Sequence, residues 1–169
     1  MKSFNTKNSG LRFFVTSRLV SLRGLGSIFT VLLLAGCGTG NSDGKLVVVS
    51  TTTHVTDMVK FVAGDRLDVI ALMGPGVDPH LYKPSAGDAA TLAKADLIFF
   101  SGLMLEGRMA DVFAKVSRRG TKAYALTENV SVELLLEPEE FEGHWDPHVW
   151  FDPRIWSQCI DVVSYALAE

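Results

Sequence analysis

Only two cysteines occur in the 169 residues, Cys37 and Cys159. Cys159 lies in a predicted helix among apolar residues, so we expect it to pack as a small hydrophobic side chain. Several enzyme motifs are also absent. The chain has no Gly-x-Ser-x-Gly elbow, no P-loop, no dinucleotide-binding Gly-x-Gly-x-x-Gly after its first predicted strand, and no His-Glu-x-x-His. The enzyme classes that these motifs mark are therefore disfavoured.

No acidic residue precedes Cys37, whereas five basic residues do: Lys2, Lys7, Arg12, Arg18 and Arg23. The apolar run that follows, Gly24 to Gly36, is too short for the roughly 20 residues that a membrane-spanning helix needs. It ends in Leu34-Ala-Gly-Cys37, which resembles the lipobox of bacterial lipoproteins. The resemblance implies cleavage before Cys37 and lipid attachment to that cysteine.

We therefore predict a signal peptide over residues 1–36 and a flexible polar tether over residues 37–44, which would anchor the protein to a membrane of the bacterial cell envelope. An uncleaved anchor with a buried cysteine is the alternative. After cleavage 133 residues remain, enough for one domain with a core of its own. Their 11 basic and 19 acidic residues give a net charge of about −8, which disfavours nucleic-acid binding and favours cations.

Apolar runs and helical patterns alternate along the remaining chain. The runs predict strands at residues 45–51, 67–73, 97–101 and 122–126. The helical patterns lie at residues 55–62, 86–94, 105–116 and 153–169, and an acidic loop at 133–142 precedes the last of them. The fold class is therefore α/β, with a four-stranded parallel sheet covered by helices on both faces. Ligands of such sheets bind at the carboxyl ends of the strands.

The stretch from Gly74 to Asp88 is the most informative one. Glycine and proline at residues 74–76 turn the chain after a strand that we expect to be buried, and Asp78-Pro79 keeps the next residues extended. His80 is thus presented from a stiff loop beyond a strand. Ser85 and Asp88 then form a capping box that begins a helix. The same device recurs where Asp146-Pro147 precedes His148 and Asp152-Pro153 begins a further helix.

Two histidines in matched loops favour a metal site, because neutral imidazole binds zinc and other first-row divalent metals. Asp78 and Asp146 could hydrogen-bond the two rings, although turn formation explains them equally well. We expect His144 to be an exposed loop residue, since Pro147 argues against a helix that would pair it with His148. His54 follows the first predicted strand and could also line the cleft, but we expect a polar position at a helix N-terminus, with no effect on metal affinity.

These stretches carry a family resemblance. Residues 73–82, 84–88, 95–106 and 146–153 resemble the zinc/manganese substrate-binding lipoproteins of bacterial ABC importers (solute-binding protein family 9, cluster A-I). The resemblance implies that His80 and His148 are two of four ligands for Zn²⁺ or Mn²⁺, and that a membrane permease is the partner. It also implies that the chain is an N-terminal fragment, with a metal-binding lobe at residues 45–152 and the start of a connecting helix at 153–169. The other two ligands belong to a second lobe in that family.

Several questions stay open at this point. Family zinc importers often have a histidine-rich loop where residues 133–142 are acidic, so manganese remains possible. The alternatives to a non-enzymatic importer receptor are a surface adhesin with structural metal and a zinc-dependent hydrolase, for which Glu142 or Asp146 would be the general base. The last helix is apolar around much of its circumference, so we expect an uncovered face, self-association and weak metal binding by this chain alone.

Overall fold

The computed structural model describes residues 44–141 and 143–169, apart from the side chain of Glu140. The predicted signal peptide, Cys37 and nearly all of the tether lie outside these residues, as does Glu142. Within the described part, no helix has both the length and the apolar character needed to cross a membrane.

A four-stranded parallel sheet forms the centre of the described part. Its strands are β1 (Leu46–Ser50), β2 (Leu67–Ala71), β3 (Leu97–Phe100) and β4 (Lys122–Ala125). They lie in the order β2-β1-β3-β4, with Leu46 opposite Leu67 and Ile98 opposite Ala123. The predicted parallel α/β sheet is confirmed. Because all four strands run the same way, the loops that follow them meet at one edge of the sheet.

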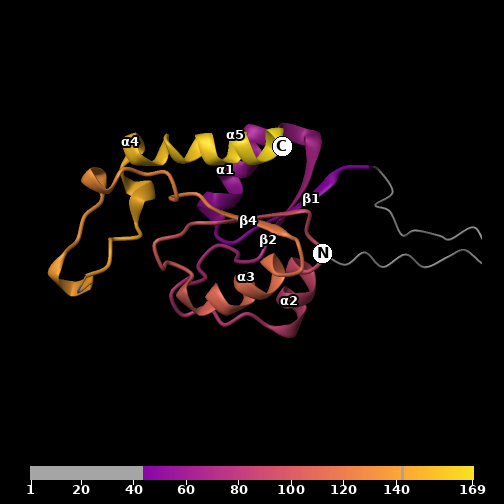
Figure 1. The fold of residues 1–169 in the computed structure, drawn as a ribbon, viewed down its shortest axis with the longest axis horizontal. Coiled ribbons are helices and arrows are strands. Elements are labelled where there is room, and N and C mark those ends of the chain that lie inside the picture. Colours follow the sequence, from indigo (N-terminus) through magenta and orange to yellow (C-terminus); the bar gives the residue numbers. More distant parts are fainter. Residues whose placement is uncertain (1–43, 142) are drawn as a thin grey trace, which may run out of the picture. The chain divides into compact units, whose positions relative to one another are not determined.

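Helices cover both faces of this sheet, as predicted. They are α1 (Thr53–Ala63), α2 (Ala86–Leu92), α3 (Ala110–Ser117), α4 (Pro153–Trp156) and α5 (Cys159–Ala168). In Figure 1, α1 and α5 lie above the sheet and α2 and α3 below it. The connections contain short 3-10 helices at Gly64–Arg66, Gly107–Met109, Val132–Leu134, Glu139–Phe141 and Val149–Phe151.

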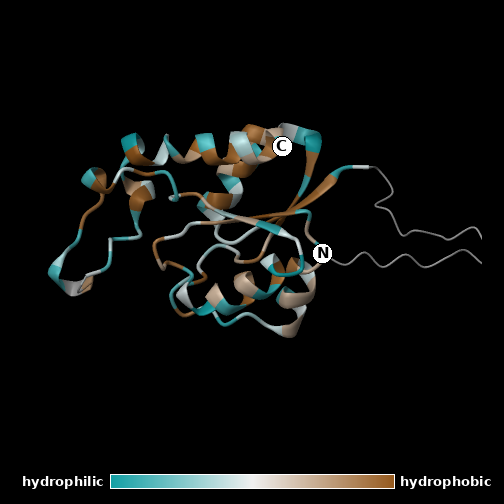
Figure 2. Cartoon of the chain, in the orientation of Figure 1, coloured by the Kyte–Doolittle hydropathy of each residue, from teal (hydrophilic) through white to brown (hydrophobic). Residues whose placement is uncertain are grey.

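The sheet separates two apolar clusters, because neighbouring residues of a strand point to opposite faces. On one face Val48 packs with Val59 of α1 and Val163 of α5. On the other face Val49 packs with Leu92 of α2 and Phe113 of α3. In Figure 2 the brown of hydrophobic residues accordingly lies on the central strands and on parts of the helices around them. Burying each such side chain contributes roughly 1.5–3 kcal/mol.

Two expectations, about β2 and α3, need correction. The strand at β2 lies at the edge of the sheet and is not buried: Ile70 is 41% exposed. The helix expected from residue 105 begins only at Ala110, after a 3-10 turn. Its apolar stripe is nevertheless found, since Leu105, Met109 and Phe113 are buried.

The final helix differs most from expectation. It is divided into α4 and α5 around Ser157 and Gln158, and much of its apolar face is covered. Ile155 and Val163 are buried in the cluster that includes residues of α1, and so is Cys159, the small hydrophobic side chain predicted above. Burial also raises the pKa of the Cys159 thiol to about 11. The expectation of an uncovered apolar face is therefore corrected for Ile155 and Val163, whereas Trp156, Ile160 and Leu167 are only partly buried; self-association stays a prediction.

Candidate metal centre

The loop that carries His80 is held by short-range hydrogen bonds. Ser85 and Asp88 form the predicted capping box: the Asp88 amide donates to Ser85 Oγ (3.2 Å) and the Ser85 amide to Asp88 Oδ2 (2.7 Å). Tyr82 also donates to Asp88, at 2.9 Å. Asp78 accepts from the backbone amide of His80 at 2.9 Å. Asp78 therefore shapes the turn, whereas a bond to the His80 ring is not seen in the described part.

The loop that carries His148 follows β4 and repeats this turn. Asp146 Oδ1 accepts from the backbone amide of His148 at 3.0 Å and from the ring nitrogen Nδ1 at 2.6 Å. Burial works against ionisation of Asp146, but these two hydrogen bonds outweigh it and lower its pKa. An ionised carboxylate is an acceptor only, so Nδ1 carries the proton and Nε2 keeps its lone pair. At Asp152, the predicted N-cap accepts from the Arg154 amide at 2.9 Å.

The two histidines meet although 68 residues separate them. His80 Nε2 lies 3.3 Å from His148 Nε2. Two nitrogens bound to one zinc ion at 2.0–2.1 Å and a tetrahedral angle are about 3.3–3.4 Å apart. The same separation fits a hydrogen bond between a protonated and an unprotonated ring nitrogen. The pair is thus arranged so that one ion can replace one proton between the rings.

No third ligand completes this pair within the described residues. There, no group of three or more His, Cys, Asp or Glu side chains could hold a metal ion. His144 is exposed, as predicted, and its amide donates to the Phe141 carbonyl. Asp146 is engaged by His148, and Glu142, the other general-base candidate of the hydrolase alternative, lies outside the described residues.

His54 lies in the first turn of α1, at the helix N-terminus as predicted, and it also makes contacts that were not expected. Its ring stacks on Trp150 with the centroids 3.9 Å apart, and a hydrogen bond of 3.0 Å joins its Nε2 to Thr52 Oγ1. Burial lowers the pKa of His54 to about 4, against a smaller opposing effect of Asp57. His54 is therefore neutral at pH 7. The aromatic pair joins α1 to the His148 loop, a contact that no local pattern could reveal.

Sequence reasoning also assigned no role to Glu106, which lies 3% exposed behind the same edge of the sheet. Its carboxylate accepts from Thr51 Oγ1 (2.7 Å) and from the amides of Ser101 (2.8 Å) and Gly102 (3.3 Å). One side chain thus joins the carboxyl ends of β1 and β3. Burial raises the pKa of Glu106, although these hydrogen bonds oppose the shift.

The raised pKa predicts how stability depends on pH. The folded state holds the Glu106 proton more tightly than the unfolded chain does. In the unfolded chain the pKa of a glutamate is about 4.3. The stabilising effect of the proton is therefore complete below that value and is lost as pH rises through the raised folded pKa. In urea unfolding between pH 4 and 8, Glu106→Gln should lack this decline. Glu128→Gln, at an exposed position, should keep it; parallel profiles for wild type and Glu106→Gln would contradict the prediction.

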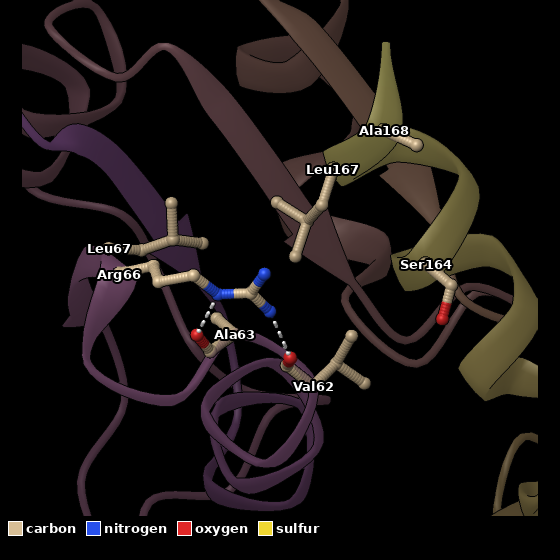
Figure 3. Close-up of a pocket in the computed structure, with 7 residues that line it drawn as sticks. All are labelled: Val62, Ala63, Arg66, Leu67, Ser164, Leu167 and Ala168. Atoms are coloured by element: carbon tan, nitrogen blue, oxygen red, sulfur yellow. Dashed lines mark hydrogen bonds between the residues drawn. The ribbon is translucent and has the colours of Figure 1, made fainter.

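A cavity of about 400 Å³ lies elsewhere, between the ends of α1 and α5 (Figure 3). Arg66 borders it and donates to the carbonyls of Ala63 and Val62, both at 2.9 Å. Leu67, the first residue of β2, also lines it. It therefore lies at the amino ends of the strands, opposite the edge where parallel sheets bind ligands. A second cavity, of about 430 Å³, is lined by His148 and Asp146 together with Leu134, Phe151 and Ile155.

Comparison with known protein families assigns this chain to one of them. The model of the family described as "Zinc-uptake complex component A periplasmic" matches residues 48–169. The chain belongs to this family. The match includes both Asp-Pro-His loops and all of α1 to α5, so the family resemblance noted in the sequence is confirmed.

Relatives of this zinc-uptake family differ in the metal for which they are named. The manganese-binding lipoprotein MntA of Bacillus subtilis is 39% identical over 141 residues, which are 81% of this chain and 45% of MntA. The zinc-binding protein TroA of Treponema pallidum is 44% identical over 129 residues, 76% of this chain and 41% of TroA. The iron ABC transporter substrate-binding lipoprotein MtsA of Streptococcus pyogenes is 34% identical over 138 residues, 76% of this chain and 44% of MtsA.

The solved structure of periplasmic TroA superposes with a TM-score of 0.69 at 43% identity, covering 74% of this chain and 44% of TroA. This chain thus spans less than half the length of these zinc-uptake relatives, and its one sheet is a single α/β lobe. The proposed limits of the lobe at residues 45–152 and of a connecting helix at 153–169 stay predictions.

Proposed function

We propose that this chain is the lobe of an ABC-importer receptor that captures zinc or manganese through His80 and His148 and delivers it to a membrane permease. The observation that carries the proposal is the 3.3 Å between the two Nε2 atoms, from loops at the carboxyl ends of β2 and β4. The names of the relatives support the same chemistry, since they bind zinc, manganese or iron. The proposal includes a lipid anchor at Cys37 that keeps the receptor at the membrane.

The local chemistry explains how capture would proceed. Asp146 holds the proton on Nδ1 of His148, which leaves Nε2 as a ligand of fixed direction. The His80 ring must place its own proton on Nδ1 for its Nε2 to bind the same ion. Borderline imidazole nitrogens favour zinc over manganese, so the pair alone should prefer Zn²⁺. The remaining ligands of a four-coordinate ion would come from outside the described residues.

Isothermal titration of the 169-residue chain tests metal capture. We expect one Zn²⁺ per chain, bound about 10²–10⁴-fold more weakly than by TroA. Loss of a residue that hydrogen-bonds a metal ligand typically lowers metal affinity by roughly 10–100-fold, and each of the two missing ligands should cost at least as much. Mn²⁺ should bind more weakly still. Delivery is tested separately by metal uptake in a strain from which the gene has been deleted. Absence of zinc binding, or unchanged uptake of both metals, would contradict the proposal.

A further inference from the structure

The His54–Trp150 stack links the first turn of α1 to the loop of His148. Its centroid distance of 3.9 Å and interplanar angle of 21° describe a close, nearly parallel contact. Trp156 makes an edge contact with His54 as well, with centroids 5.7 Å apart and an interplanar angle of 69°. Thr52 bonds the Nε2 edge of the same ring. His54 is therefore held by three contacts, and it holds Trp150 in turn.

Trp150 passes this constraint on to His148. The two rings make an edge contact with centroids 5.2 Å apart and an interplanar angle of 63°. Phe141 lies on the His148 ring as well, at 6.3 Å. Asp146 fixes the Nδ1 corner, but a single hydrogen bond leaves the ring free to tilt about it. The edge contact with Trp150 limits that tilt, provided that Trp150 itself cannot turn.

We propose that His54 is a positioning residue for metal capture: through its stack on Trp150 it holds the His148 imidazole in the orientation that directs Nε2 toward His80. This inference rests on the proposed function for its metal and on the stack alone for its geometry. His54 is not assigned as a ligand, because its Nε2 is hydrogen-bonded to Thr52 Oγ1 and its ring is stacked on Trp150. The expectation that His54 has no effect on metal affinity is replaced by this proposal.

Zinc titration of the 169-residue chain is the first test. His54→Ala removes the ring that holds Trp150 and should weaken Zn²⁺ binding about 10-fold, at the lower end of what outer partners of a ligand contribute. His54→Phe keeps an aromatic ring but no nitrogen, and should bind within about threefold of wild type if stacking is what matters. His144→Ala removes an exposed histidine of the neighbouring loop and should bind like wild type.

The second test needs no metal. In ¹⁵N spectra of the imidazole nitrogens, wild type and His54→Phe should give His148 signals typical of a single tautomer with protonated Nδ1. His54→Ala should give averaged or broadened His148 signals, while circular dichroism and the melting temperature show that it is folded. A simple packing role would lower the melting temperature without changing these signals.

The outcomes separate the two proposals. If wild type shows no zinc binding but His54→Ala still disorders the His148 ring, the metal function fails and the positioning role stands. If His54→Ala leaves both zinc affinity and the His148 signals unchanged, the positioning role is overturned. It is also overturned if His54→Phe behaves like His54→Ala, because stacking would then not be the cause. If His54→Ala does not fold, His54→Phe is compared with wild type instead. Loss of both zinc affinity and the single-tautomer His148 signal in His54→Phe overturns the positioning role, and retention of both supports it.

Discussion

Zinc binding by this chain should fall at least about 100-fold when either His80 or His148 is replaced by alanine. Each variant removes one of the two nitrogens that lie 3.3 Å apart, and one imidazole cannot hold the ion in a chelate. Loss of a residue that only hydrogen-bonds a metal ligand typically lowers metal affinity by about 10–100-fold. Loss of a direct ligand should therefore lower it by at least about 100-fold. Isothermal titration at pH 7.5 measures the change.

The chain contains its own control for this result. His144 lies four residues before His148 but is exposed, and His144→Ala should bind zinc like wild type. The melting temperatures of all three metal-free variants should stay close to that of wild type, since His80 is exposed and His148 only half-buried. Normal zinc affinity in His80→Ala would remove this residue from the site and leave His148 without its partner.

Replacing Gly102 by alanine should destabilise the fold by about 2–5 kcal/mol. Gly102 lies two residues after the end of β3 with a φ of +95°, and an added Cβ would lie 2.3 Å from Thr127 Oγ1 and 3.1 Å from Ala125 Cβ. The positive φ costs roughly 1–2 kcal/mol for an L-residue. Displacing packed neighbours adds about 1–3 kcal/mol. Urea unfolding of wild type and variant gives the difference directly.

Gly120 provides the matched comparison. Its φ is +100°, but an added Cβ there would meet nothing within 4 Å. Gly120→Ala should therefore show the backbone cost alone, about 1–2 kcal/mol. Adding Thr127→Ala to Gly102→Ala should recover part of the loss, because it removes the nearest clash. Equal losses at Gly102 and Gly120 would show that close approach of β3 and β4 is not the reason for the glycine.

Gly102 matters for the site because it allows the carboxyl ends of β3 and β4 to approach. Its amide also donates to Glu106, which joins β3 to β1. The edge that carries the histidine loops is therefore held by one glycine and one buried carboxylate. The sequence around Gly102 and Glu106 does not distinguish this role from that of residues in an ordinary turn.

The features that could be predicted from the sequence are local ones. Apolar runs and helical spacing were enough for four parallel strands with helices on both faces, because burial imposes those periods on neighbouring residues. Capping at Ser85 and Asp152 was predictable because a cap is formed within three residues. The two Asp-Pro-His turns were predictable for the same reason.

Which of these residues meet depends on the packing of the whole fold. The order of the strands, the cover that α1 provides for α5, and the 3.3 Å between His80 and His148 depend on groups far apart in the chain. The final helix was misjudged for this reason: its apolar residues were visible, but their partners were not. The helix N-terminal position of His54 was predictable, but its contact with Trp150, 96 residues away, was not. Local patterns record which face of an element is buried, whereas packing alone determines what it is buried against.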